Sequence, residues 1–585
     1  MEHFEEAARV AQPDGRERSP WADVIPSRRR DRVFVVLVAV LVMLPPSVDL
    51  LRGSTQRRLF SICAADAFYY LTVARNIAET GRPTFDGVHL TNGYHPLWQL
   101  LTGGLAAVTR ILGAGDVWTL GLVIALGIAL TGAAALVVCL AINASRGSLH
   151  PSVLLVPLGA ASVIQAPLMW IWWRSTGRPS TTLWGAVNGM ETSAVLLAYA
   201  ICALLYVRVA RTRGGGICFG LALSSLMLAR LDHAIFSICL LLGAVLFDPR
   251  SRPFWLAAAG TFGVALLAYL SLNRIWFGTP LPVSGMAKST FPFYTTANLR
   301  LALHMLRDPK TVPMTHAHRV FQMLIPACAA LFTLARDGGQ LVVRKPRWAF
   351  KPSLRSRLDE FTLSTSVAVL VLFLYNFCFV IPWDQGHWYF PVSNLFVTLT
   401  CIASLERLPF PRAGARFPHT GDVVAACIGS ALVLLGFSKL SRSNEESPMA
   451  KFFFDEAPLI RKFYGHRRAR MVEYDDGIVT FSTGIPAMSG LVLAIDAEAL
   501  KATWAVPGGR RAAALLDLAI SRGYDRFATF AYPHGSVDRS SAPGDIRDAY
   551  KFYIKNGASG CKLRVEYRSR ASEFAIIKTN CRSRR

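Results

Sequence analysis

The sequence contains few charged residues, since Asp, Glu, Lys and Arg together make up 17% of its 585 residues. This shortage excludes an ordinary soluble domain, in which about a quarter of the residues are charged. Apolar residues take their place: 52% of the chain is hydrophobic, and apolar runs recur between residues 33 and 440. A helix of about 20 apolar residues is long enough to cross a bilayer. The sequence therefore predicts a polytopic α-helical membrane protein.

Acidic residues are the scarcer kind of charge, with 38 Asp and Glu against 63 Lys and Arg and a net charge of +25. Nucleic-acid binding would explain such a surplus, but no module of basic and aromatic residues accompanies it. Much of the surplus falls in short segments between apolar runs, at 28–32, 211–213, 336–357 and 407–416. We interpret these segments as cytoplasmic, following the positive-inside rule, and expect no nucleic-acid partner.

Two further features are absent from the sequence, a secretory signal and a metal-binding cysteine motif. Residues 1–32 lack the apolar core and small-residue cleavage site of a secretory signal, so the first apolar run is expected to be an uncleaved anchor with this tail in the cytoplasm. The eleven cysteines show no metal-binding spacing, and most lie inside apolar runs, where cysteine behaves as a small hydrophobic residue. The cysteines therefore predict no metal site.

We expect about eleven membrane-spanning helices. The first runs from Val33 to Leu51 and is broken by Pro45 and Pro46. Residues 97–113 are expected to be re-entrant or interfacial, because a crossing there would spoil the charge bias of the later loops. The other runs are 117–142, 151–173, 191–209, 217–229, 234–247, 254–273, 321–335, 362–383, 388–404 and 423–438.

An odd number of spans that starts in the cytoplasm leaves the C-terminus outside. Residues 1–32 are then a cytoplasmic tail, 33–440 a transmembrane domain with an outer loop at 52–96, and 441–585 an extracytoplasmic domain. The same count places three further segments on the outer face with Asp66, namely 174–190, 274–316 and the turn from Asp384 to His387. Polar residues from distant parts of the chain are thus expected to converge on one side of the membrane.

The extracytoplasmic domain is predicted to be small and of the α/β or α+β class. Three segments have the pattern of strands and a fourth that of a helix closed by Gly523. The strands are 477–484, 491–496 and 527–532, and the helix is 510–521.

The last part of this domain, residues 561–581, alternates like a hairpin. Cys561 and Cys581 are equidistant from residue 571, so hairpin register would set them opposite each other. A disulfide between them is expected in an oxidising compartment.

The outer loop begins with a candidate for chemistry. Residues 64–79 have the pattern of an amphipathic helix that lies along the membrane surface. Asp66 stands near its start, beside Tyr69 and Tyr70, where a partly desolvated carboxylate could act as a general base. Helix capping or solvation at the interface would explain Asp66 equally. Asp86, in Phe-Asp-Gly, is interpreted as a turn residue.

Other polar residues on the same face have two readings each. His95 either contacts a ligand or anchors the chain at the interface with its aromatic neighbours. Glu191 either caps the helix that follows it or belongs to a polar site. Arg230 and Asp232, with His233, form a polar elbow between two short apolar runs, as expected of a site sunk below the membrane surface.

Cations of the outer face are candidates for binding a phosphate group. Arg274 and Lys288 flank a turn rich in Pro and Gly. Snorkelling to the interface explains Arg274, whereas Lys288 is remote from the end of a span and could serve as a point charge for phosphate. His387 and Tyr389, in Trp-Asp-Gln-Gly-His-Trp-Tyr, belong either to this site or to an interfacial aromatic belt.

Four segments in this order resemble a known family: DAFYYLTVARNIAETGRPTFDGVHLTNGYHPLW, NGMETS, LARLDHAIF and PLPVSGMAKS. They are similar to bacterial integral-membrane glycosyltransferases of the GT-C superfamily, of the kind termed family-39-like. The likeness extends to about residue 400, and YDDGIVTFSTGIPAMSGLV resembles the start of the outer domain in these proteins.

The resemblance implies a GT-C fold in a bacterial inner membrane and inverting transfer of a sugar from a polyprenyl-phosphate carrier to an extracytoplasmic hydroxyl. The catalytic acid of the first outer loop maps onto Asp66, which would act as the base. Relatives commonly carry a second acid immediately before it, where this chain has Ala65. A divalent metal is therefore open, but Ala65 argues against a site of paired carboxylates.

The same resemblance implies roles for the other candidates. Lys288 is the first candidate for binding the donor phosphate, and Arg230 and His387 are the next candidates. The outer domain would bind carbohydrate or position the acceptor, which is a glycan, a lipid or a protein; arabinofuranose, mannose and galactose donors all stay open. The sugar and acceptor pocket would be formed by His95, Glu191, Asp232, Tyr69 and Tyr389.

A transporter or flippase of a lipid-linked glycan is the competing hypothesis, since it would share the spans and buried polar residues. Transporters often contain repeats with interrupted helices in both halves. No such repeat is found in this sequence, and a large domain on one side favours chemistry at the surface. A scaffold without activity would not explain acids and cations on a single face.

Overall fold

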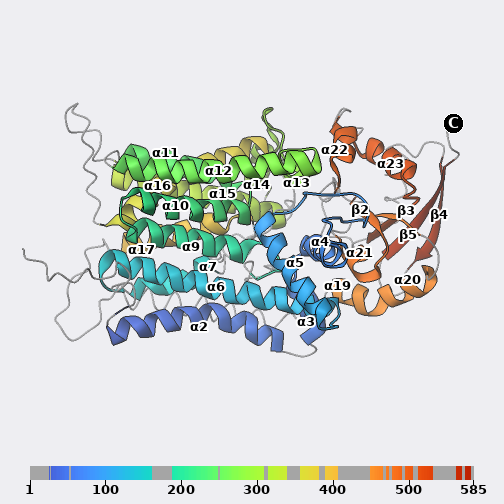
Figure 1. Ribbon diagram of the computed structural model, residues 1–585, viewed down its shortest axis with the longest axis horizontal. Coiled ribbons are helices and arrows are strands. Elements are labelled where there is room, and N and C mark those ends of the chain that lie inside the picture. Colours follow the sequence, from blue (N-terminus) through green and yellow to red (C-terminus); the bar gives the residue numbers. More distant parts are fainter. Residues whose placement is uncertain are drawn as a thin grey trace, which may run out of the picture.

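The computed structural model is an elongated bundle of helices with a small β-sheet at one end (Figure 1). We call that end of the bundle the sheet end and the opposite end the far end. The structure describes residues 26, 28–51, 55–149, 151–160, 187–247, 251–308, 314–338, 356–380, 389–405, 448–464, 469–473, 477–489, 495–504, 511–530, 561–568 and 574–581.

The bundle consists of helices that run along the long axis (Figure 1). Two short elements, η1 (Pro151–Leu155) and α7 (Val156–Ala160), join them, and the π-turn η3 (Leu334–Gly338) extends α15. The long helices are α2 (Arg29–Leu51), α6 (Asp116–Arg146), α9 (Thr192–Arg208), α10 (Arg213–Ala229), α11 (His233–Phe247), α12 (Arg252–Phe277), α15 (Met314–Thr333), α16 (Arg357–Phe379) and α17 (Pro391–Leu405).

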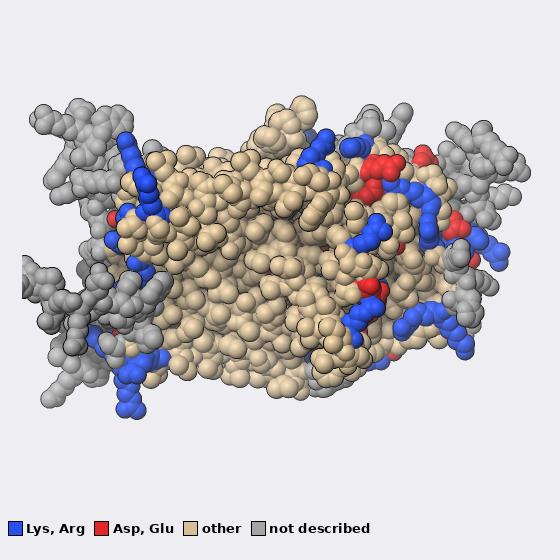
Figure 2. Space-filling view, viewed as in Figure 1, with Lys and Arg blue, Asp and Glu red and all other residues tan. Residues whose placement is uncertain are grey.

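Five helices among the described residues are long and apolar enough to cross a membrane, and four shorter apolar helices accompany them. Figure 2 shows that the charged side chains of this view gather at the two ends of the molecule and leave the middle free of charge. An uncharged band between two charged ends is what a bilayer requires. The described part thus fits a membrane protein, while the count of about eleven spans stays a prediction.

Within the described residues, the predicted spans correspond to these helices, and one detail, in α2, differs. α2 continues through Pro45 and Pro46 without a break, so the predicted interruption is wrong. The two prolines remove the helical amides that would donate to the carbonyls of Leu41 and Val42, and such prolines are tolerated in membrane helices. The run 423–438 and most of 151–173 lie outside the described residues.

Short helices cover the sheet end of the bundle. The segment predicted to be re-entrant or interfacial is one of them, because α5 has 16 residues and slants across the ends of the longer helices (Figure 1). α4 ends at Thr80 and is followed by Gly81, which has a φ of 71°. These short helices are α3 (Thr55–Ile62), α4 (Ala67–Thr80), α5 (Pro96–Ile111), α13 (Val283–Lys288) and α14 (Ala297–Arg307).

The C-terminal segment, residues 448–581, contains the sheet. The strand order is β2-β1-β3-β5-β4, with β1 parallel to β2 and β3 and the other pairs antiparallel. The strands are β1 (Met471–Glu473), β2 (Ala487–Ser489), β3 (Arg526–Phe530), β4 (Cys561–Arg568) and β5 (Phe574–Cys581). The helical elements are α19 (Pro448–Lys451), the π-turn η6 (Phe452–Glu456), α20 (Ala457–Tyr464), α21 (Ile478–Thr483), α22 (Ala497–Trp504) and α23 (Arg511–Ser521).

The sequence prediction for this segment was partly wrong. Residues 527–530 form a strand and 511–521 a helix that is followed by Gly523 with φ of 81°, as predicted. Residues 478–483, predicted as a strand, form the helix α21 between Gly477 and Gly484. Strand propensity depends strongly on context. Here both sides of β1 are already paired, and the Glu473 carboxylate accepts the amides of Val479 and Thr480, which favours the start of a helix.

The hairpin register at the end of the chain was predicted correctly, since Cys561 pairs with Cys581 across β4 and β5. We expect these two cysteines to form a disulfide in the protein isolated from an oxidising compartment. Intact-mass measurement of the unreduced protein after thiol alkylation should then show two fewer labels than after reduction. The same number of labels before and after reduction would contradict the prediction.

Candidate active site

Asp66 precedes α4 at the sheet end of the bundle. The segment before α9 runs directly past it, and the Ala64 amide donates to the carbonyl of Asn188 (2.8 Å). Gly189, with φ of 80°, follows that carbonyl. A Cβ at Gly189 would lie 2.9 Å from the Cβ of Ala67, so only glycine allows this approach. The Asn-Gly pair thus supports the start of α4 from one side.

The first half of α4 is buried on every side. The eight residues from Ala67 to Ala74 are all buried, and not only the apolar stripe that the periodicity indicated. α5 and α21 both pack on the helix. The exposed side expected of a helix lying on a surface is therefore absent from this half of α4, and Asp66 is half-buried at the end of an enclosed helix.

Three of the predicted pocket residues meet in one buried ion cluster, which consists of Glu191, Arg230, Asp232, His95 and Tyr70. The Arg230 guanidinium donates from Nη1 to Glu191 (2.8 Å) and from Nε to Asp232 (3.0 Å). The Tyr70 hydroxyl donates to Glu191 (3.2 Å). His95 accepts the Leu231 amide on Nδ1 (3.3 Å), which leaves the proton on Nε2, 3.6 Å from Glu191.

These contacts decide between two earlier alternatives for the acids. Neither Asp66 nor Glu191 makes a side-chain capping hydrogen bond to its helix. Glu191 instead faces Arg230 in the ion cluster, and the polar elbow predicted at residues 230–233 is present, with His233 bonded to Asp232 (2.9 Å). Glu191 is thus part of a polar site rather than a cap.

Burial and charge set the protonation of the ion cluster. Desolvation lowers the pKa of His95 to about 4, against the opposing effect of Glu191. For Asp232 desolvation raises the pKa, but Arg230 and His233 together outweigh it and hold the pKa below its ordinary value. At neutral pH the ion cluster therefore contains a neutral imidazole and a charged guanidinium, which lies between two acids.

A second group joins Lys288, Tyr389 and Asp66. The Lys288 ammonium donates to the Tyr389 hydroxyl (2.5 Å). Burial lowers the pKa of Lys288, yet the oxygen of Tyr389 and the charge of Asp66 act the other way and leave it raised. Burial raises the pKa of Tyr389. At neutral pH this group thus presents an ammonium and a phenol beside a carboxylate.

Tyr389 connects the two groups. The Arg230 guanidinium lies over its ring at 4.4 Å from the centroid, and Lys288 is 5.1 Å from the same centroid. Arg319 of α15, fully buried, adds a third cation that interacts with Tyr389 and donates to the carbonyl of Val380 (3.2 Å). The sequence interpretation did not include Arg319, although a charge next to an apolar run marks a functional candidate.

The remaining predicted site residues are placed as follows. Tyr69 points to the C-terminal segment, where its hydroxyl pairs with that of Ser489 (3.0 Å). Its role in a sugar pocket stays a prediction, and His387 lies outside the described residues. Asp86 is a turn residue, as interpreted, because it accepts the amides of Val88 and His89.

The residues beside Asp66 do not fit a metal site of paired carboxylates. Ala65 supplies no ligand, and Asp66 interacts with the Lys288 ammonium. Glu191 is engaged by Arg230. Among the described residues, no group of three or more His, Cys, Asp or Glu is arranged to hold a metal ion. We therefore derive no metal-dependent step.

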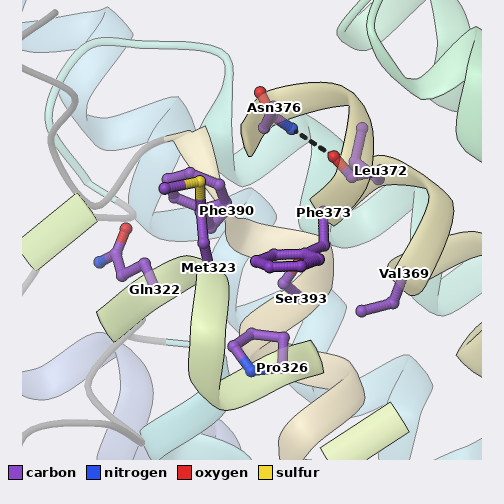
Figure 3. A pocket seen from close by; sticks show the side chains of 9 residues that line it. All are labelled: Gln322, Met323, Pro326, Val369, Leu372, Phe373, Asn376, Phe390 and Ser393. Carbon is purple, nitrogen blue, oxygen red and sulfur yellow. Dashed lines mark hydrogen bonds between the residues drawn. The ribbon is translucent and has the colours of Figure 1, made fainter. Parts of the chain in front are cut away.

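Two cavities lie near these groups without containing them. A crevice of about 10 Å³ lies between α15, α16 and the residues around the start of α17. The rings of Phe373 and Phe390 belong to its lining (Figure 3). It has room for about one water molecule and none for a sugar. A cavity of about 250 Å³ adjoins α4, α5 and α21, lined in part by the ion pair of Arg75 and Asp116 (3.1 Å).

The C-terminal segment contacts α4 through α21, and the buried acid Glu473 holds the start of α21. Glu473, at the end of β1, accepts the amides of Val479 (2.6 Å) and Thr480 (2.9 Å) and so holds the start of α21. At the other end of α21, Arg75 of α4 donates to the carbonyl of Phe481 (3.0 Å). Burial raises the pKa of Glu473 to about 7 in spite of these hydrogen bonds.

Glu473 should make the stability of the folded protein depend on pH. Its pKa is higher in the folded than in the unfolded chain, so its contribution is complete below pH 4.5 and is lost as the pH rises to about 7. The loss is about 3 kcal/mol. Thermal melting of the wild type in detergent should fall over this range, and the fall should be smaller in Glu473→Gln. Glu498→Gln, at an exposed carboxylate, is the control and should keep the wild-type slope.

No protein-family model and no curated protein matches the sequence. Solved structures do. Apo ArnT from Cupriavidus metallidurans aligns over 93% of this chain and 97% of its own, with a TM-score of 0.51 and 13% identity. The chain shares the fold of ArnT. The fold expected from the resemblance in sequence is thereby confirmed.

Two further structures are similar at lower scores. ArnT from Cupriavidus metallidurans bound to undecaprenyl phosphate has a TM-score of 0.48 at 12% identity and covers 94% of this chain and 98% of its own. The archaeal oligosaccharyltransferase AglB from Archaeoglobus fulgidus, in complex with an inhibitory peptide and a dolichol-phosphate, has a TM-score of 0.45 at 12% identity. It covers 95% of this chain and 74% of its own.

Proposed function

We propose that this protein is an inverting glycosyltransferase, which moves a sugar from a polyprenyl-phosphate carrier to an acceptor hydroxyl. One observation carries the proposal: Asp66, which precedes α4, lies close enough to Lys288 of α13 for its charge to act on the ammonium, at the end of the bundle beside the C-terminal segment (Figure 1). The reaction needs a base for the hydroxyl and a cation for the phosphate. ArnT, whose fold the chain shares, has been crystallised with undecaprenyl phosphate.

The proposed reaction is a single displacement. Asp66 takes the proton of the acceptor hydroxyl while its oxygen attacks the anomeric carbon from the side opposite the phosphate. The bond between that carbon and the phosphate oxygen breaks, and the electron pair leaves with polyprenyl phosphate. No general acid is needed because the leaving phosphate is already an anion, and Lys288 stabilises its growing charge.

The two groups of the site have different tasks in this proposal. The Arg230 guanidinium is held by Glu191 and Asp232, so we assign it to fixing the pocket wall and only secondarily to the phosphate. Lys288 donates to the Tyr389 hydroxyl and lies beside the proposed base, so we assign it to the phosphate. Glu191, Asp232 and His95 would bound the sugar or acceptor pocket, together with Tyr389.

The sheet end is proposed to face away from the cytoplasm, in a bacterial inner membrane. The positive-inside rule supports this orientation, because arginines stand at far-end termini of six bundle helices. They are Arg29 of α2, Arg146 of α6, Arg208 of α9, Arg213 of α10, Arg252 of α12 and Arg357 of α16. The C-terminal segment would then be an extracytoplasmic domain that covers the site and positions the acceptor.

The proposal is tested by mass spectrometry of envelope glycans from a strain that lacks this protein. We expect one type of sugar residue to be missing, which would name both donor and acceptor. The purified protein should then release polyprenyl phosphate from the matching donor only when that acceptor is present. Donor that crosses the bilayer of reconstituted vesicles without any transfer would instead favour a flippase.

A further inference from the structure

Two glycines of the C-terminal segment enclose α21 and differ in what surrounds them. Gly477 precedes the helix with φ of 89°, and Gly484 follows it with φ of 70°. A Cβ at Gly477 would lie 2.9 Å from the amide nitrogen of Tyr69 and 3.0 Å from the carbonyl carbon of Phe68. A Cβ at Gly484 would meet nothing within 4 Å. Gly477 alone is therefore in direct contact with the backbone of α4.

This contact falls on the first turn of α4, two to three residues after Asp66. A second glycine contacts the same turn, since Gly189, in the segment before α9, packs on Ala67. Glu473 fixes the position of α21 by accepting two of its amides, as described above. The first turn of α4 thus lies between a glycine of the bundle and a glycine of the C-terminal segment.

We propose that Gly477 is a positioning residue for Asp66. Because it has no side chain, α21 can pack directly on the backbone of Phe68 and Tyr69, and this packing sets where the preceding carboxylate stands relative to Lys288. The inference rests on the proposed function and extends it: the C-terminal segment, more than 400 residues away along the chain, completes the mounting of the base.

The paired glycines supply a matched experiment. Gly477→Ala and Gly484→Ala impose a similar backbone strain, since both positions have positive φ. Only Gly477→Ala pushes on α4. We expect it to lower kcat by about 10- to 100-fold with less than a twofold change in the KM for the lipid donor, because a displacement of about 1 Å at a reacting group has effects of this size. Gly484→Ala should keep kcat within about threefold of wild type.

A second measurement does not depend on activity. Hydrogen exchange of the amides at residues 67–74, recorded without substrate, should be faster in Gly477→Ala than in Gly484→Ala. If the wild type transfers no sugar, the proposed function fails, and the exchange result still decides whether α21 holds α4. Equal exchange in the two variants, or an equal fall in kcat, would overturn the proposal.

Another pair of variants serves if Gly477→Ala does not fold. Arg75→Ala removes the donors to the carbonyls of Thr480 and Phe481, which hold α21 to α4. Asp116→Asn weakens only the ion pair on the other side of Arg75. Faster exchange at residues 67–74 and lower kcat are expected for Arg75→Ala and not for Asp116→Asn; the same behaviour in both would count against a positioning role.

Discussion

Replacing Asp66 with asparagine is expected to lower the rate of sugar transfer by about 10²- to 10⁴-fold, the range that loss of a general base produces. Asparagine has nearly the same shape but cannot take a proton. The KM for the lipid donor should change little, because Asp66 acts on the acceptor. The measurement is transfer by the purified protein from a labelled polyprenyl-phosphate sugar at saturating donor and acceptor.

The control for this result is Glu79→Gln, which changes an exposed carboxylate of α4. It should leave kcat within about threefold of wild type, since surface substitutions have small effects. Both variants must give the wild-type elution profile in size-exclusion chromatography. Turnover at the wild-type rate by Asp66→Asn would remove Asp66 from the role of base.

Loss of Lys288 is the second large expected effect. Lys288→Ala should lower kcat by about 10²- to 10³-fold, as does loss of one preorganised group that stabilises developing negative charge. The KM for the donor should rise as well, because the same ammonium attracts the phosphate before reaction. Steady-state kinetics against donor concentration separate these two effects.

Two variants make the Lys288 result specific. Lys288→Arg keeps the positive charge and should recover part of the activity, although its planar head differs in shape from an ammonium. Lys501→Ala removes an exposed lysine from α22 of the C-terminal segment and should behave as wild type. An unchanged kcat and donor KM in Lys288→Ala would exclude a phosphate contact.

The helices of the bundle were predictable because each needs only a long apolar run, a property of neighbouring residues. The elbow at Arg230 to His233 was predictable for the same reason, since two short apolar runs meet there. Predicted residues do meet in the ion cluster, but the sequence does not show which of them pair with each other. Glu191 and Arg230 are 39 residues apart, and whether an acid caps its own helix or faces a distant guanidinium depends on packing.

The C-terminal segment was harder because its elements are short. Six residues with strand-like composition became α21, and the reason lies outside them: β1 is paired on both sides, and Glu473 accepts the amides at the start of the helix. The contact of Gly477 with α4 was equally invisible. A glycine before a short helix has many explanations, and only the position of α4 shows which one applies.

The grip of Gly189 and Gly477 on α4 has a consequence for the order in which the protein matures. During synthesis the bundle helices and Asp66 emerge long before α21 does. Until the sheet folds around β1, one side of α4 has no partner and its backbone can move. The proposed base is held partly by this late-folding segment and stays poorly aligned in a partly made chain, so sugar transfer would begin only once bundle and sheet have come together.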